Sequence, residues 1–378
     1  MPWTLPNELF IPIIESVGCD QKTLLTLLTV SRHFYTLALP LLYKTLWISR
    51  RDLSDRRDLQ FVVDKLYHGI EANPGLRSTT SLSFDLGCFF IPVPDIRTIL
   101  PHLPSLRRLS IRGPSFIDPE TLWLLPSTAQ LTHLELQNTF YSHRFVDFLE
   151  RHTALEFIHI GQLGRDTKIK DDAHPTLSRN AVPRLRSISV PLGVLQQFGG
   201  RTAVVDLEIP DLIAVPPASP FDIEAAFAPA RTLSVDQIYF TGAPSWVSLL
   251  PNMRYLRVHM PPSDMDGSWR ALSATSVAYV RFQSVSMPRE SERPVRRLFG
   301  DVRSLALVDV GVVGGRLFYR YYRDSEGKLK VPIPHCQWKP WWASAEDDIA
   351  DAVKRSQPAS DRTSQVELYS CRQRLCKF

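Results

Sequence analysis

The sequence lacks a long uncharged apolar segment. Its most apolar stretch is LLTVSRHFYTLALPLLYKTLWIS, residues 27–49. The polar side chains of Arg32, His33 and Lys44 interrupt this stretch, and Pro40 lies within it. A membrane-spanning helix needs about 20 consecutive, mostly apolar residues, so we expect no membrane span. The N-terminus has no basic region followed by a short apolar run and a small-residue cleavage site, so we expect no secretory leader.

Cysteine is scarce, and a strong net charge is absent. Five cysteines are scattered over 378 residues, an odd number without the spacing of a disulfide framework. This pattern favours free thiols and therefore the cytoplasm, the nucleus or both. The formal net charge is only +5, and the basic residues are not concentrated in one stripe. We therefore expect neither nucleic acid nor a membrane among the partners.

Motifs of the common enzyme classes are absent as well. The sequence contains no Gly-x-Ser-x-Gly elbow, no phosphate-binding loop ending in Gly-Lys-Ser/Thr and no His-Glu-x-x-His pair, each of which would position reactive groups in a known way. The ten histidines show no triad-like order. We expect a protein that is not an enzyme and that has no catalytic residue, no cofactor and no metal site.

The N-terminal region, residues 5–49, has the spacing of several short helices. Helical faces are indicated by Leu9, Ile13, Ile14, Val17, Leu24, Leu25, Leu27 and Leu28. Ser31 is placed to cap a further helix that carries Phe34, and Pro40 fits the first turn of another. A module this small cannot bury all of its apolar side chains internally. Part of this surface must therefore contact another domain or another protein.

These residues resemble an F-box, a family whose pattern is a Leu-Pro-x-Glu start, an apolar helix, a Leu-rich helix and then Val-Cys-basic-basic-Trp. The matching positions are Leu5, Pro6, Glu8, Leu9, Leu24, Leu25, Val30, Arg32 and His33. Ser31 stands in place of the usual Cys and Phe34 in place of the usual Trp, and Pro12 lies within the first helix. The resemblance covers about the first 48 residues.

The resemblance implies that this module binds a Skp-type adaptor and, through it, the cullin core of a ubiquitin ligase. The adaptor-binding residues that it implies are Leu5, Pro6, Leu9, Ile13, Leu24, Leu25, Leu28, Val30, Ser31, Arg32 and Phe34. The alternative is a helical cap that packs on the next domain without binding an adaptor.

A Leu-x-x-Leu-x-Leu-like stretch recurs along the rest of the chain. Its central apolar residues are Leu82, Leu109, Leu134, Ile158, Ile188, Leu207, Leu233, Leu256, Val280 and Leu305. Most successive spacings are 23 to 27 residues, with outliers of 30 and 19 on either side of Ile188, which resembles the 20–29-residue period of leucine-rich repeats. Each unit would supply a short strand and a return segment, such as the amphipathic residues 142–152, and the units would stack into a solenoid.

The expected fold is therefore α/β, with a short helical F-box module at residues 1–49 and a leucine-rich-repeat-like solenoid, or horseshoe, at residues 50–315. Residues 316–378 would form a hairpin and a helix that cap the solenoid, followed by a partly disordered tail. The repeats are degenerate, because Pro114 and Thr139 stand where the family has Asn or Cys. The alternative is a doubly wound parallel sheet, which the missing Gly-rich first loop disfavours.

In a leucine-rich repeat the residues on either side of each central position point to the concave side. This places Tyr255 beside Tyr279 and Arg257 beside Arg281, with Arg254 nearby. Tyr and Arg are enriched at binding hot spots, so we predict that this patch binds an acidic or phosphorylated protein segment. The alternative is a solvated strand face without a ligand.

The resemblances to an F-box and to leucine-rich repeats together imply the substrate-recognition subunit of an SCF-type cullin ubiquitin ligase, whose repeats would bind an unknown protein substrate. A leucine-rich-repeat scaffold that has no role in ubiquitin transfer is the alternative function. An enzyme built on an α/β sheet is a third, which the missing motifs disfavour.

Overall fold

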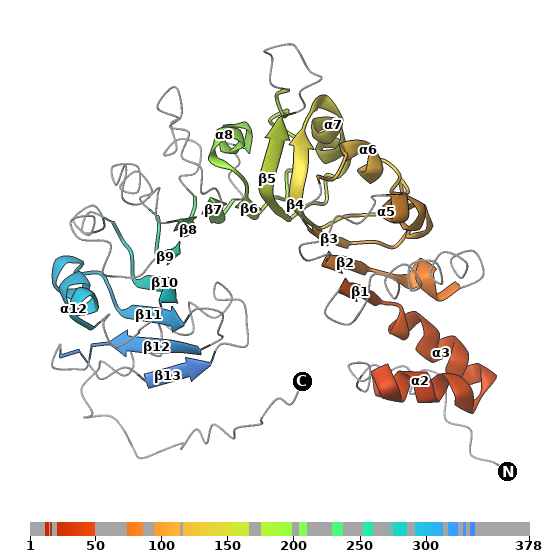
Figure 1. Cartoon of the computed structure of the whole chain (residues 1–378), viewed down its shortest axis with the longest axis horizontal. Helices are drawn as coiled ribbons and strands as arrows, with labels where there is room; N and C mark the ends of the chain where they lie inside the picture. Colours follow the sequence, from red (N-terminus) through yellow and green to blue (C-terminus); the bar gives the residue numbers. More distant parts are fainter. Residues whose placement is uncertain are drawn as a thin grey trace.

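The chain is α/β and is built around one sheet whose strands follow one another in chain order (Figure 1). The computed structural model describes residues 12–14, 16, 21–49, 74–85, 94–113, 116–165, 175–198, 204–209, 229–236, 252–259, 272, 275–285, 292–312, 317–323, 328, 329 and 333–336. Within these residues the sheet has 13 strands. A doubly wound sheet would reverse its strand order part-way, so the sequential order excludes that alternative.

Eleven of these strands run parallel, and the last two run antiparallel. The parallel strands are β1 Thr45–Ser49, β2 Ser81–Asp85, β3 Arg108–Arg112, β4 His133–Tyr141, β5 Phe157–Arg165, β6 Ser187–Ser189, β7 Asp206–Ile209, β8 Thr232–Asp236, β9 Tyr255–His259, β10 Tyr279–Val285 and β11 Leu307–Val312. The antiparallel strands are β12 Leu317–Tyr322 and β13 Ile333–Cys336.

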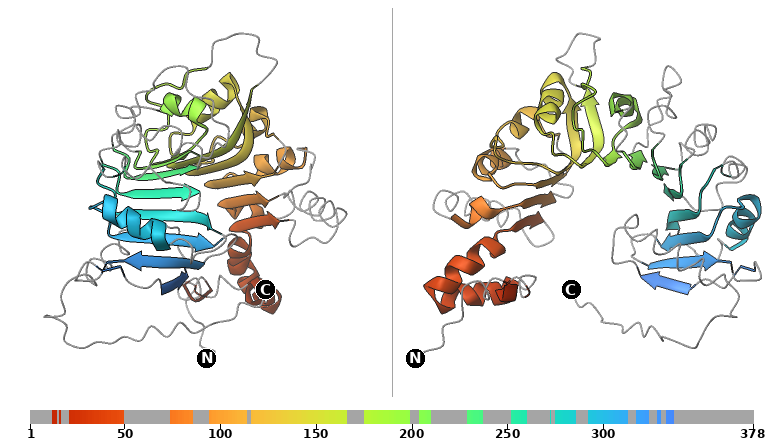
Figure 2. Two further views of the ribbon diagram at one scale, coloured as in Figure 1. Left: turned by 60° about the vertical axis from the view of Figure 1, so that its left-hand side comes forward. Right: turned by 180° about the vertical axis from the view of Figure 1, so that it is seen from behind.

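The sheet curves into an arc, with the strands along its inner side and the helices on its outer side (Figures 1 and 2). The outer elements are α5 Pro94–Ile99, α6 Pro119–Leu122, α7 His143–Arg151, α8 Leu192–Leu195 and α12 Glu292–Asp301, with the 3₁₀ turns η2 Pro74–Ser78, η3 Leu100–His102 and η4 Gln196–Phe198. Helix α7 shows why such segments cover the sheet. Ser142 caps it by accepting a hydrogen bond from the Phe145 amide at 3.3 Å, and Phe145, Phe148 and Leu149 are buried.

The core lies between the sheet and the outer elements and is organised in three columns of buried residues. The central column is Leu82, Leu109, Leu134, Ile158, Ile188, Leu207, Leu233, Leu256, Val280 and Val308, each paired in register with the next. A second column lies three residues earlier, from Thr79 and Leu106 to Leu305. A third lies two residues later, from Phe84 to Val190 and from Val258 to Val310. The predicted central residues are thus confirmed at nine positions out of ten.

The last repeat corrects the prediction. Val308, not Leu305, pairs with Val280, and β11 begins at Leu307. Leu305 is buried, but it occupies the column three residues earlier. A shift of three residues exchanges the two faces of a strand, so Leu307 and Asp309, instead of Ser304 and Ala306, lie on the inner face.

Each parallel strand after β1 enters the sheet through the same backbone contact. The carbonyl oxygen two residues before each central position accepts hydrogen bonds from two successive amides of the next repeat, at 2.8–3.1 Å. The carbonyls that do so belong to Lys44, Thr80, Arg107, Thr132, Glu156, Arg186, Val205, Arg231, Arg254 and Ala278. These hydrogen bonds satisfy the carbonyl and amide groups at the entry to each strand and hold neighbouring repeats in register.

Two helices precede the sheet, α2 Gln21–Val30 and α3 Arg32–Leu42. Ser31 caps α3 as predicted, since its hydroxyl accepts a hydrogen bond from the Phe34 amide at 3.2 Å. The prediction that Pro40 begins a separate helix is wrong, because Pro40 lies inside α3. Only two helical residues follow it, so the missing N–H costs the helix a single hydrogen bond close to its end.

Strand β1 follows α3 directly and pairs with β2, so the first 49 residues supply both the helices and the first strand of the sheet. At the other end, β12 pairs antiparallel with β11, and β13 pairs antiparallel with β12. The helix and tail predicted within residues 337–378 lie outside the described residues.

Candidate binding face

The inner face of the arc is formed by the residues immediately before and after each central position, because successive side chains of a strand alternate between its two faces. From β2 to β11 these pairs are Ser81/Ser83, Arg108/Ser110, His133/Glu135, Phe157/His159, Ser187/Ser189, Asp206/Glu208, Thr232/Ser234, Tyr255/Arg257, Tyr279/Arg281 and Leu307/Asp309. The face is therefore mostly polar, while the opposite face of the same strands forms the core.

The predicted Tyr/Arg patch is assembled in register on β9 and β10. Tyr255 pairs with Tyr279, and Arg257 pairs with Arg281. Arg254 precedes β9 and is exposed. Tyr255, Tyr279 and Arg281 are buried, however, and Arg257 is only partly exposed. The patch therefore offers a partner mainly the side chains of Arg254 and Arg257.

The two tyrosines belong to a small apolar cluster on the inner face that also contains Leu307. The hydroxyl of Tyr279 donates a hydrogen bond of 2.6 Å to Asp309 Oδ2. Burial, together with the nearby Asp309 carboxylate, raises the pKa of Tyr279 well above its ordinary value. The hydroxyl of Tyr279 thus remains a neutral donor at physiological pH.

Arg281 is held against an aromatic ring of the C-terminal strands. Its guanidinium carbon lies 3.6 Å from the centroid of the Phe318 ring, a cation–π contact. Burial lowers the pKa of Arg281 to about 10, although the neighbouring Tyr279 and Asp309 oppose that change. Arg281 therefore stays charged at neutral pH in a largely dry environment.

Asp309 was not predicted as an inner-face residue, because the sequence pattern places the central residue of the last strand at Leu305, three residues before Val308. Asp309 is buried and accepts two hydrogen bonds from Arg320 of β12, one of 2.9 Å from Nε and one of 2.8 Å from a terminal nitrogen. Tyr279, Arg281, Asp309 and Arg320 together form a buried charged group that joins the parallel strands to the antiparallel end of the sheet.

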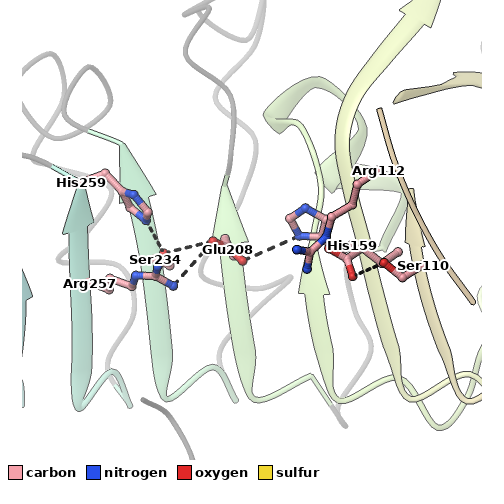
Figure 3. Close-up of polar contacts among 8 residues, drawn as sticks. Ser110, Arg112, His159, Glu208, Ser234, Arg257 and His259 are labelled. Carbon is pink, nitrogen blue, oxygen red and sulfur yellow. Dashed lines mark hydrogen bonds and ion pairs between the residues drawn. The ribbon is translucent and has the colours of Figure 1, made fainter. Parts of the chain in front are cut away.

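Figure 3 shows the polar contacts of the middle strands, which centre on Glu208. Glu208 Oε1 lies 4.0 Å from Arg257 and 3.5 Å from the hydroxyl of Ser234, and Oε2 lies 3.9 Å from His159 Nδ1. The hydroxyl of Ser234 also lies 3.5 Å from His259 Nε2. All of these contacts are at the long limit for hydrogen bonds or ion pairs. Burial lowers the pKa of Arg257, and Glu208 opposes that change.

A tighter group lies on β3 and β4 (Figure 3). Glu135 accepts hydrogen bonds from Arg112 Nε at 2.6 Å and from the hydroxyl of Ser110 at 2.7 Å. Burial alone would raise the pKa of Glu135, but these two hydrogen bonds outweigh it, and the pKa is lowered. Beside this group, the rings of His133 and Phe157 stack with their centroids 5.7 Å apart.

The helical module leaves several apolar side chains in solvent. Among the described residues, its buried core consists of Ile14, Leu24 and Ala38 and is separate from the core of the sheet. The exposed fraction is 52% for Ile13, 52% for Leu25 and 59% for Val30.

The other residues that the F-box resemblance names are distributed around this core. Leu28 and Phe34 are half-buried and pack against it, whereas Ser31 and Arg32 are exposed. Leu24 supports the module from inside. Leu5, Pro6 and Leu9 lie outside the described residues.

None of the helices in the described residues has the length and the apolar character needed to cross a membrane. No group of three or more His, Cys, Asp and Glu side chains in the same residues is arranged to hold a metal ion.

The chain was also compared with known proteins. No protein-family model matches it, and no curated protein sequence matches it.

Proposed function

We propose that this chain is the substrate-recognition subunit of an SCF-type cullin ubiquitin ligase. The helices before the sheet bind a Skp-type adaptor, and the inner face of the sheet binds a protein substrate. The chain itself carries out no reaction, and it acts in the cytoplasm, the nucleus or both. The resemblance of residues 1–48 to an F-box and the spacing of the leucine-rich-like strands support this proposal.

The observation that carries the proposal is the exposed apolar surface of the helical module. Ile13, Leu25 and Val30 are each more than half exposed. Fully burying an exposed side chain of this kind gains about 1.5–3 kcal/mol, so burying the exposed half of each of these gains about half as much. An amphipathic helical surface is a common docking element. Leu25 and Val30 both match positions at which the F-box pattern is apolar.

The junction between α3 and β1 supports a role for the module in positioning the sheet. Tyr43 ends α3, and its carbonyl oxygen accepts a hydrogen bond of 2.9 Å from the hydroxyl of Thr79, at the entry to β2. The amides of Thr80 and Ser81 both donate to the Lys44 carbonyl. An adaptor bound to α2 and α3 would therefore hold the inner face of the sheet in a defined orientation.

The same junction favours the second candidate, a repeat scaffold whose N-terminal helices only cap the first strand. The separate core of the helical module argues against a pure cap, because a cap would share its buried residues with the sheet. The adaptor proposal accounts for both the separate core and the exposed leucine and valine.

Co-purification with a Skp-type adaptor tests the proposal. The informative truncation removes residues 1–42, because Thr45–Ser49 form β1 and their loss would expose the edge of β2. We expect the full chain to bring the adaptor with it and the truncated chain to lose it. Adaptor binding that survives the truncation would exclude this role for the helices and favour the scaffold.

A further inference from the structure

The middle of the inner face is a strip of short side chains on either side of an acidic strand. Strand β7 contributes Asp206 and Glu208 to this face. Its neighbours β6 and β8 contribute only hydroxyl side chains, those of Ser187, Ser189, Thr232 and Ser234. Longer side chains follow on both sides, Phe157 and His159 on β5 and Tyr255 and Arg257 on β9. The two carboxylates therefore lie between short side chains, with an aromatic residue at each border.

The two oxygens of Glu208 have different surroundings (Figure 3). Oε1 faces β8 and β9, where it meets Ser234 and Arg257. Oε2 faces β5, and the partner that the structure gives it is His159 Nδ1 at 3.9 Å, an ion pair only when the imidazole is protonated. The Glu208 side chain is 32% exposed, so Oε2 has room to accept a hydrogen bond from a ligand.

Ser189 supplies an independent observation at the same place. It lies on β6 between His159 and Glu208, paired in register with both. It is only 1% exposed, and its Oγ has no hydrogen-bond partner among the described residues. A buried hydroxyl without a partner costs stability, and such groups are rare in folded proteins. A ligand atom that enters between His159 and Glu208 would give Ser189 the missing hydrogen bond.

The charge of the strip determines the sign of that ligand. Asp206 and Glu208 supply two carboxylates to the inner face of β6 to β9, and Arg257 supplies one guanidinium. Asp206 is engaged by the hydroxyl of Thr232, and burial raises the pKa of Asp206. The inner-face residues of β5 and β6 that lie next to Glu208 Oε2 include no lysine or arginine, so this oxygen favours a positively charged ligand.

We propose that this strip binds a lysine side chain of a protein segment, with the ammonium group between Glu208 Oε2, Ser189 Oγ and His159 Nδ1. An ammonium group has three N–H donors and no acceptor, which matches these three acceptors when His159 is neutral. Phe157, two residues before His159 on the same face of β5, offers a nearby ring to the cation or its alkyl stem, a contact that aromatic rings favour. The identity of this segment rests on the proposed function, because we take the segment to be part of the protein substrate.

The test uses the purified full chain, without adaptor, and an array of N-terminally acetylated peptides. Each peptide has one lysine among varied neutral residues and a twin in which that lysine is acetylated, so that only the charge and the N–H donors differ. We expect selected lysine peptides to bind at least tenfold more tightly than their acetylated twins. Equal binding of both twins, binding of no peptide, or a preference for peptides with aspartate or glutamate would overturn the proposal.

Three variants locate the site. Glu208→Gln should lower the affinity for the best lysine peptide at least tenfold, whereas Asp85→Asn, which removes an equal charge from the inner face of the distant strand β2, should leave it unchanged. Ser189→Ala should weaken binding about threefold without lowering the thermal unfolding midpoint, since it removes a buried hydroxyl that has no partner. If the hydroxyl of Ser189 contributed only to the fold, Ser189→Ala would not weaken peptide binding. An equal loss with Asp85→Asn and Glu208→Gln would show a diffuse charge effect and contradict the site.

The peptide array and the adaptor experiment can contradict the lysine site and the ligase role separately. If lysine peptides bind but the adaptor does not, the site on β5 to β7 stands and the ligase role falls. If the adaptor binds and no lysine peptide does, the ligase role stands and the lysine site falls.

Discussion

Arg320 of β12 and Asp309 of β11 form a buried two-point ion pair across the first antiparallel step of the sheet. Their Cα atoms are paired in register, and both carboxylate oxygens accept hydrogen bonds from the guanidinium group, at 2.9 and 2.8 Å. Tyr279 donates a third hydrogen bond to the same carboxylate. This contact closes the parallel stack, because it fixes β12 on β11 through polar geometry that only one register satisfies.

Removing the carboxylate should destabilise the C-terminal end of the sheet. Asp309→Ala removes the carboxylate that binds both the buried Tyr279 and Arg320, whose side chain is only 12% exposed, which costs roughly 3–5 kcal/mol of unfolding free energy. Urea denaturation followed by circular dichroism measures the loss. The control is Glu292→Ala, which removes an exposed ion pair to Arg296 on α12 and should cost less than about 0.5 kcal/mol. Equal losses in the two variants would contradict the role assigned to Asp309.

Glycine is needed at position 311 because the ring of Phe318 lies against it. A Cβ atom there would be 2.6 Å from Phe318 Cε1, so Gly311→Ala must displace the ring on which Arg281 stacks. We expect a loss of about 1–3 kcal/mol, as for other overpacked sites. Gly300→Ala is the matched control, since a Cβ at that position of α12 meets nothing within 4 Å. That variant should be stabilised by roughly 0.5–1 kcal/mol, and the opposite signs of the two changes are the result to measure.

The buried imidazole of His152, which follows α7, should make the stability of the fold depend on pH. It is buried beside Phe148, with the ring centroids 4.4 Å apart, and burial lowers its pKa from 6.5 to about 4. Between these values the unfolded chain binds the proton and the folded chain does not, so stability must fall as the pH falls from about 6.5 to about 4. The loss should be up to about 3 kcal/mol, since one pKa unit corresponds to about 1.4 kcal/mol.

His152→Leu should remove this part of the pH profile while keeping a side chain of similar size next to Phe148. The exposed His143, at the start of the same helix, gives the control variant His143→Gln, which should keep the profile of the unmodified chain. Chemical denaturation at pH 7, 5.5 and 4.5 compares the three proteins. An unchanged profile in the His152→Leu protein would show that this residue does not carry the effect.

The strand register could be predicted from the sequence because the repeat places an apolar residue at the same position of every strand. Nine central residues, from Leu82 to Val280, were assigned correctly, although β7 follows β6 after only 19 residues. The tenth failed because VRSLAL and LALVDV both fit the pattern near residue 305. The usual spacing favoured the first of these, while the hydrogen bonds of Ala306 and Leu307 to the Ala278 carbonyl select the second.

Which inner-face side chains are buried could not be predicted in the same way. The pattern placed Tyr255, Tyr279 and Arg281 correctly on that face, but their burial depends on the strands that follow. Phe318 and Arg320 come from an antiparallel strand that no repeat spacing describes. The exposed Trp47, in register with Ser83, was also missed as an inner-face residue, because β1 precedes β2 by more than one repeat length.

The most direct test of the central claim is the affinity of the purified full chain for a Skp-type adaptor, measured by titration calorimetry. The test variant carries Leu25→Asp with Val30→Asp, and the control carries Leu124→Asp, at an exposed leucine on the outer side of the arc. The account predicts that the unmodified chain and the control bind equally, while the double variant binds at least tenfold more weakly with an unchanged unfolding midpoint. An unmodified chain that does not bind, or a double variant that binds as tightly as the control, would contradict it.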